Sequence, residues 1–171
     1  KILVDLVKEI DVYPEIGMLV NISDVTRAVG GCAPNTAIDI AKIDHNIPIS
    51  VIGKIGDDES GRYVTAQMSR HGIDCGRVSV SATKPTGFSD VMSDPQGERT
   101  FFHARGANDE FSPADVDLAA LDCSILHIGY ILLLGAFDQK DEEYGTVMAQ
   151  LAKLSDEELQ KLRYSADCLR K

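Results

Sequence analysis

The chain has 171 residues, of which 44% are hydrophobic and 26% charged, a balance typical of a globular domain large enough to bury a core. Its net charge of −10 argues against a surface that binds nucleic acid or an anionic membrane, because such surfaces favour patches of lysine and arginine. The longest apolar run, 131–134, is far too short to cross a bilayer, and no basic region followed by an apolar core opens the chain. We therefore expect a single domain in a cytoplasmic protein.

Cysteine and histidine positions bear on the redox compartment and on metal binding. The four cysteines, Cys32, Cys75, Cys123 and Cys168, are widely separated and contain no CxxC pair. We expect free thiols in a reducing compartment. The four histidines are equally scattered, so the sequence predicts no metal site.

In chain order, the first half alternates patterns of strand and helix, as a parallel α/β fold requires. Gly72 and Ile73 suit the left-handed position and the hydrophobic contact that end a helix. A start on a strand without Met indicates an N-terminus that has been lost. The expected elements are a strand at 1–7, strand-like stretches at 18–23 and 25–29, a helix at 33–43, a strand at 49–53 and a helix at 61–71.

The second half begins with a hairpin at 86–92 and 99–103, joined by an Asp-Pro-Gln-Gly turn. Its apolar side chains either cover a ligand as a lid or pair with another chain, since exposed strand edges invite pairing. The stretch 124–129 predicts a central parallel strand. Two amphipathic helices then abut near 153–155 with no strand between them. We hypothesise that residues are omitted there, and the alternative is a genuine αα-hairpin.

The turn into the first helix carries the strongest functional signal. Gly30 and Gly31 allow the backbone to pass close to a ligand, and Pro34 suits a first helical turn. Asn35 presents an amide at the helix N-terminus, where donors point outward. This pattern favours a site for a small polyhydroxylated molecule, and a plain strand-to-helix turn is the alternative.

Together with the glycine-rich stretch that follows, this turn resembles the first signature of the PfkB, or ribokinase-like, carbohydrate kinases. The likeness extends more loosely over 1–153. The second signature of that family, Asp-Thr-x-Gly-Ala-Gly-Asp, is not found in the chain, and the nearest string, at 135–138, lacks the second glycine. The residues that carry the resemblance are Gly31, Asn35, Ala37, Ala41, Gly53, Gly56, Asp58 and Gly61.

The resemblance implies a ribokinase-like three-layer α/β/α fold with a mostly parallel sheet and a small β lid, incomplete at the C-terminus. We expect one partial domain over 1–171, with lid strands at about 13–29 and 86–104. For 53–61 we favour a structural role, with Asp58 as a helix cap. The resemblance implies that the substrate-binding residues are Asp5, Gly30, Gly31, Asn35, Arg105 and Asn108.

Alternatives remain open at several of these positions. From the residues alone, Asp5 is a strand-end acid with a local partner, and Arg105 is a solvated surface cation. His127 fits a packed strand position better than a catalytic one. Some sugar kinases of this family carry a Glu where Gly129 and Tyr130 stand here, which leaves the substrate open.

The implied activity is ATP-dependent phosphorylation of a sugar or nucleoside hydroxyl by the complete protein, with Mg²⁺. In this family the general base is the last Asp of the second signature, so we assign no catalytic residue and no metal ligand to this chain. We expect it to supply the acceptor half-site and the lid, to be inactive alone, and to form a homodimer through its lid strands. The competing hypothesis is a catalytically incompetent protein that binds a polyol or a partner. A nicotinamide-binding domain fits less well, because the glycines do not follow GxGxxG.

Overall fold

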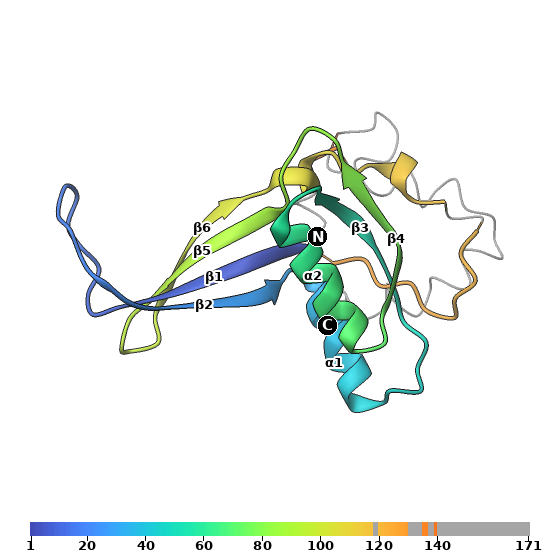
Figure 1. Cartoon of the computed structure of the whole chain (residues 1–171), viewed down its shortest axis with the longest axis horizontal. Helices are drawn as coiled ribbons and strands as arrows, with labels where there is room; N and C mark the ends of the chain where they lie inside the picture. The colour runs from blue at the N-terminus through green and yellow to red at the C-terminus, as the bar shows by residue number, and fades with distance from the viewer. Residues whose placement is uncertain (118–119, 130–134, 137–138, 140–171) are drawn as a thin grey trace.

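A computed structural model of the chain describes residues 1–117, 120–129, 135–136 and 139 (Figure 1). The two helices expected after 140 and the hypothesised omission near 153–155 lie outside these residues, as does Cys168. None of the helices in the described ranges is long and apolar enough to span a membrane.

A four-stranded sheet, here called the lid sheet, extends away from the rest of the molecule to the left of Figure 1. Its order is β2 (Ile22–Gly30), β1 (Leu3–Ile10), β5 (Gly87–Ser93) and β6 (Arg99–Ala104). β1 pairs antiparallel with β2 and parallel with β5, and β5 pairs antiparallel with β6. The hairpin expected at 86–103 is thus confirmed, and the first strand of the chain joins the same sheet.

The expected strand at 18–23 is only partly correct. β2 begins at Ile22 and runs past Asp24 with a shift in its register against β1 between Glu9 and Ile10, whereas 13–21 belong to the exposed connection between β1 and β2. Ile16 and Leu19 are almost fully exposed, so apolar composition there reflects no buried strand.

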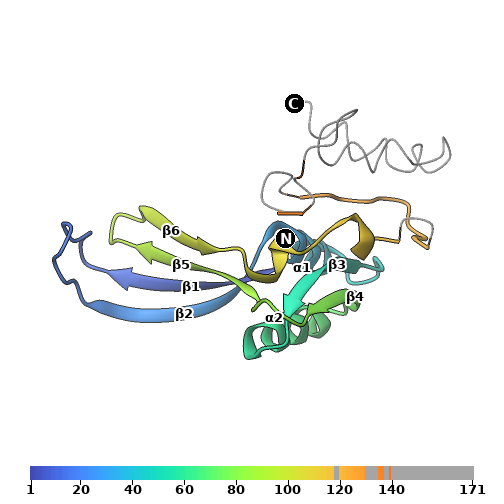
Figure 2. The same cartoon turned by 90° about the horizontal axis from the view of Figure 1, so that it is seen from above.

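A second, two-stranded parallel sheet contains β3 (Ser50–Gly56) and β4 (Asp74–Ser81). The helices α1 (Cys32–Ile43) and α2 (Glu59–Arg70) precede and follow β3 in the chain. Seen from above in Figure 2, α2 lies on one side of β3 and β4, and the segment 106–117 lies on the other. Both helices begin and end within two residues of their predicted limits, and Gly72 takes the expected left-handed conformation, with φ of 74°.

The hydrophobic core lies where the two helices meet β1, β3 and β4. Ala37 and Ala41 form the small buried face of α1, which lets that helix approach the strands closely. The remaining members come from α2, from β1 and β3, and from the residues just before β1 and β4; the buried cluster comprises Ile2, Val4, Ala37, Ala41, Val51, Ile55, Val64, Met68 and Ile73.

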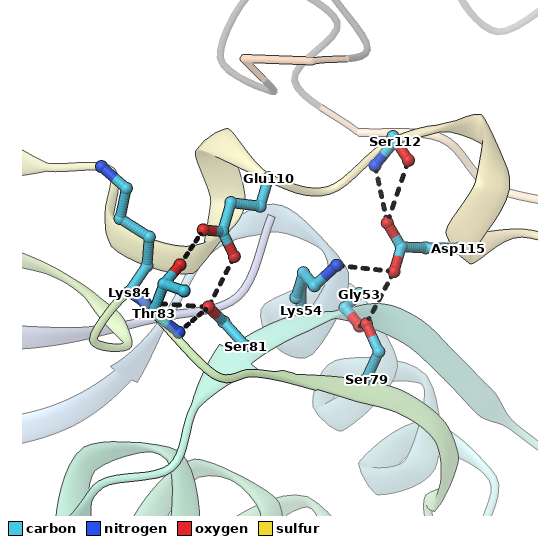
Figure 3. A network of polar contacts seen from close by, with 9 residues as sticks. All are labelled: Gly53, Lys54, Ser79, Ser81, Thr83, Lys84, Glu110, Ser112 and Asp115. Atoms are coloured by element: carbon cyan, nitrogen blue, oxygen red, sulfur yellow. Dashed lines mark hydrogen bonds and ion pairs between the residues drawn. The ribbon is translucent and has the colours of Figure 1, made fainter.

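Polar contacts hold the segment after β6 against β3 and β4 (Figure 3). Asp115 accepts hydrogen bonds from Lys54 Nζ at 2.8 Å and from Ser79 Oγ at 3.1 Å. Glu110 accepts one from Ser81 Oγ at 2.5 Å and another from the Thr83 hydroxyl. These bonds fix the end of the lid hairpin relative to the parallel strands.

The predicted strand at 124–129 is wrong. Residues 120–129 form no strand in the structure, and Ile125 is 68% exposed. Their backbone pairs with none of the strands described above, so an apolar run alone did not produce a ladder.

Candidate functional site

Asp5 and Gly30 meet where the lid sheet joins the rest of the molecule. Asp5 of β1 pairs with Ala28 of β2, and Gly30 lies two residues further along the same face. A Cβ atom at Gly30 would overlap the Asp5 carboxylate oxygen Oδ2 and the Leu3 side chain. Only glycine therefore leaves room for this carboxylate to lie against the backbone of β2.

The N-terminus of α1 follows directly from that contact. Gly31 is the N-cap residue, with φ of 95°, and a Cβ there would overlap the backbone carbonyl of Lys1. Asn35 lies exposed in the first turn, and its backbone N–H donates to the Gly31 carbonyl at 3.1 Å. Helix N-termini attract electronegative groups. The structure thus brings Asp5, Gly30, Gly31 and the start of α1 into one continuous region.

The Asp5 carboxyl is half-buried, and its surroundings disturb its ionisation. Burial raises the pKa of Asp5, while a hydrogen bond from Ser89 and the nearby charges of Lys1, His103 and Arg99 act in the opposite direction. The net result is a pKa above the ordinary value for aspartate. A carboxylate whose own fold leaves it under-stabilised gains more from a ligand that donates hydrogen bonds.

Arg105 and Asn108 lie just after β6, in a single 3-10 turn (Gly106–Asp109) and the residue before it. Arg105 is partly exposed and pairs with Asp109 across 3.5 Å. The Asn108 side chain is buried; its Oδ1 accepts from Ile2 N at 2.9 Å, and its Nδ2 donates to Ile2 O at 2.8 Å and to Arg105 O at 2.9 Å. These bonds tie the end of the hairpin to the start of β1. A direct contact between either side chain and a ligand stays a prediction.

Ser89 and His103 were not among the predicted site residues, yet they lie next to Asp5. Ser89 pairs with Asp5 across β1 and β5, and with His103 across β5 and β6. The position of the Asp-Pro-Gln-Gly turn fixes the register of the hairpin, so the pairing of Ser89 with His103 could have been predicted from the sequence. Nothing local in the sequence sets β5 beside β1, because that pairing joins segments more than 80 residues apart.

The second motif stretch, 53–61, has a different character. Asp58 caps α2: its Oδ1 accepts from Gly61 N, and its two oxygens accept from the backbone and the hydroxyl of Thr86, each at 2.7 Å. Gly56 N donates to the same hydroxyl at 2.9 Å. A Cβ at Gly56 or Gly61 would lie 2.5 Å from backbone atoms. The predicted role of Asp58 as a helix cap is confirmed.

Within the residues that the structure describes, no group of three or more His, Cys, Asp or Glu side chains is arranged to hold a metal ion.

Comparison with known proteins identifies relatives over most of the chain. The model of the pfkB family of carbohydrate kinases matches residues 3–168. A ribokinase from Dictyostelium discoideum is 30% identical over 110 residues, which cover 64% of this chain and 34% of that protein. Fructokinase-1 from Oryza sativa subsp. japonica is 30% identical over 111 residues, which cover 63% of this chain and 34% of that protein. The chain thus spans about a third of the length of these relatives.

Solved structures show the same fold. The ribokinase from Thermotoga maritima superposes with a TM-score of 0.67 at 22% identity, over 94% of this chain and 55% of that one. An archaeal nucleoside kinase of the ribokinase family, from Methanocaldococcus jannaschii, superposes with a TM-score of 0.63 at 20% identity, over 94% of this chain and 54% of that one. Arabidopsis thaliana ribokinase, complexed with ribose and ATP, gives 0.56 at 24% identity, over 66% and 35%. The ribokinase-like α/β fold expected from the sequence is confirmed.

Proposed function

Because this chain belongs to the pfkB family of carbohydrate kinases, we propose that it supplies the acceptor-binding part of an enzyme that phosphorylates a sugar or nucleoside hydroxyl with ATP. One observation carries the proposal. The half-buried Asp5 carboxylate, with its raised pKa, lies against Gly30 beside the N-terminus of α1.

In this proposal the chain binds and orients the acceptor. The Asp5 carboxylate accepts hydrogen bonds from two sugar hydroxyls, and bonds to an ionised acceptor are about twice as strong as neutral ones. Gly30 and Gly31 give the sugar room to approach the backbone, and Asn35 adds an amide. Arg105 is proposed to supply positive charge to the acceptor. Phosphoryl transfer depends largely on such positioning, because it lowers the entropic part of the barrier.

The complete enzyme is proposed to use ATP and Mg²⁺. ATP supplies the transferred phosphoryl group, and Mg²⁺ neutralises charge on its phosphates. The solved ribokinase from Cryptococcus neoformans contains ADP, which fits this assignment. We assign neither ligand to residues of this chain. We propose that residues 1–171 alone do not catalyse the phosphorylation.

Two finer proposals concern assembly and location. β2 and β6 are the edges of the lid sheet, and they expose Ile22, Val25, Phe101 and Phe102. Since exposed apolar edge strands favour pairing, we propose a homodimer through the lid strands, which light scattering of the purified protein tests. An ATP-dependent sugar kinase has its cosubstrate in the cytoplasm, where we propose that it works.

The deciding experiment uses the full-length protein that contains this sequence. ADP release is measured with ATP, Mg²⁺ and a panel of pentoses, hexoses and nucleosides, and acceptor binding is measured separately by calorimetry. We expect turnover with one acceptor class and its loss in Asp5→Ala, with Asp39→Ala on the exposed face of α1 as the matched control. Acceptor binding without turnover would favour the polyol-binding alternative. The absence of both binding and turnover would overturn the proposal.

A further inference from the structure

Three polar side chains form a row across the base of the lid sheet. Asp5 of β1 is directly paired with Ser89 of β5, which is directly paired with His103 of β6. Directly paired residues point to the same face of a sheet, so the three side chains and Gly30 share one face. Ser89 is 6% exposed, so the centre of the row is shielded from water.

The hydrogen bonds in this row have a direction. His103 Nδ1 lies 3.1 Å from the Ser89 hydroxyl oxygen and 3.1 Å from the backbone carbonyl of Phe88. A carbonyl only accepts, so the bond to Phe88 places the imidazole proton on Nδ1. That N–H then faces the Ser89 oxygen as a donor, which leaves the Ser89 hydroxyl proton available for the paired Asp5 carboxylate.

The charged groups around the row favour a neutral imidazole beside an ionised carboxylate. Burial lowers the pKa of His103, Lys1 and Arg105 lower it further, and the Phe88 carbonyl and Asp5 act in the opposite direction. For Asp5, the Ser89 hydrogen bond and the charges of Lys1, His103 and Arg99 partly offset the effect of burial. The row therefore joins an imidazole, a hydroxyl and a carboxyl group, and the neighbouring cations favour a neutral imidazole and an ionised carboxylate.

We propose that Ser89 and His103 form a hydrogen-bond relay that sets the orientation of the Asp5 carboxylate for the acceptor. His103 donates to Ser89, Ser89 donates to Asp5, and the carboxylate keeps acceptor capacity for hydroxyl groups of the sugar. This inference rests on the proposed function for its purpose, and both side chains are positioning residues. It identifies a contribution of β6 to acceptor binding that acts through β5.

The first arm of the test needs no sugar. Long-range proton–nitrogen NMR spectra of the full-length protein report the tautomer and the pKa of His103, whose signals are assigned by their loss in His103→Asn. We expect the neutral ring to carry its proton on Nδ1, and Asp5→Asn to lower the pKa of His103, because it removes a nearby negative charge. A proton on Nε2, or a titration unchanged by Asp5→Asn, would overturn the relay.

The second arm measures its effect on the acceptor. We expect Ser89→Ala to raise the KM for sugar about tenfold, the effect of one hydrogen bond to a charged group, and to leave the KM for ATP unchanged. The acidic limb of the pH profile of kcat/KM for sugar moves to higher pH, because loss of the Ser89 bond raises the pKa of Asp5. Ser93→Ala, on the same face of β5, is the matched control.

Substitution of His103 separates the relay from simple packing. His103→Phe keeps a ring and loses the donor, so we expect the same direction of change as in Ser89→Ala, by about threefold. His103→Asn retains a side-chain N–H and restores most of the loss. Any of three outcomes would overturn the inference. These are equal changes in the KM for sugar and the KM for ATP, an unchanged acidic limb of the pH profile, or equal effects of His103→Phe and His103→Asn.

The two arms distinguish failure of this inference from failure of the proposed function. If the wild-type protein neither binds nor phosphorylates any acceptor, the proposed function fails, and the NMR arm still decides whether the relay exists. If turnover is present and the tautomer or the titration is wrong, the proposed function stands and the relay is overturned.

Discussion

Asp5 in the lid sheet and Asp58 at the start of α2 are carboxylates in contrasting surroundings. Burial raises the pKa of Asp5, and the Ser89 hydrogen bond and the charges of Lys1, His103 and Arg99 offset it only in part. Burial also acts to raise the pKa of Asp58, but hydrogen bonds from the Thr86 hydroxyl and from the backbone of Gly61 and Thr86 outweigh it and lower the pKa. The Asp58 carboxylate is occupied by the fold, whereas Asp5 keeps acceptor capacity for a ligand.

The two carboxylates therefore affect stability in opposite ways. The contribution of Asp58 is present above 3.8, the ordinary pKa of aspartate, and is lost as the pH falls through its lowered folded pKa. For Asp5 the folded state binds its proton more tightly than the unfolded state does. Its ionisation consequently costs stability as the pH rises from 3.8 through its raised pKa.

The largest expected effect is that of Asp5→Asn. We expect kcat/KM for the acceptor to fall about a hundredfold, roughly 2.7 kcal/mol, because a charged acceptor becomes a neutral one. The stability of the variant relative to wild type should increase as the pH rises through the raised pKa of Asp5. Acceptor kinetics and urea unfolding at several pH values measure both. Unchanged kinetics would remove Asp5 from the acceptor site.

Gly30→Ala tests the same region without removing the charge. Its Cβ would overlap Asp5 Oδ2, so the carboxylate must turn away, and we expect about a thirtyfold loss of acceptor affinity, roughly 2 kcal/mol. Calorimetry with the acceptor measures it. Gly97→Ala is the control, because it has a left-handed φ of 84° and nothing within 4 Å of its Cβ. A similar loss in that variant would show a general effect on folding.

Asp58→Ala should lower stability and leave acceptor kinetics almost unchanged, the reverse of what we expect for Asp5→Asn. We expect the free energy of unfolding at pH 7 to fall by about 1.5 kcal/mol through loss of the helix cap, with the acceptor KM almost unchanged. The difference from wild type should shrink as the pH falls below 3.8, where the wild-type cap becomes protonated. Chemical unfolding between pH 2.5 and 7 provides the measurement. This range extends below 3.8 because the pKa of Asp58 is lowered in the folded state. A large rise in acceptor KM would contradict a purely structural role.

The smallest effect is expected for Thr86→Val. The variant keeps the shape of the side chain and removes the hydroxyl that donates to Asp58 and accepts from Gly56 N. We expect a loss of about 1 kcal/mol in unfolding free energy. Thr86→Ser keeps the hydroxyl and serves as the control. Equal stability of the two variants would show that the methyl group, rather than the hydrogen bonds, matters here.

The elements with local signals were predictable from the sequence. Asp58 and Gly72 mark the two ends of α2, and Asp94 stabilises the hairpin turn by accepting from the backbone of Gln96 and Glu98. These interactions join residues fewer than five positions apart, so side-chain chemistry along the chain encodes them. The motif at 30–35, together with the glycine-rich stretch at 53–61, likewise indicated the family, because the spacing within each piece is local.

Pairings between distant segments were not predictable in the same way. The stretch 124–129 has the composition of a strand, yet it pairs with none of the described strands. The row of Asp5, Ser89 and His103 depends on β1 lying parallel to β5 in one particular register. A shift of one residue would turn Ser89 to the opposite face of the sheet.

The sequence alone thus determined the type of fold, the ends of α1 and α2, the hairpin turn and the motif residues at the start of α1. Only the tertiary structure decided which side chains surround Asp5, and that Asn108 ties the hairpin to the start of β1. The physical reason is that caps and turns are stabilised by neighbours in the chain. Strand order and register, in contrast, are set by packing of the whole domain.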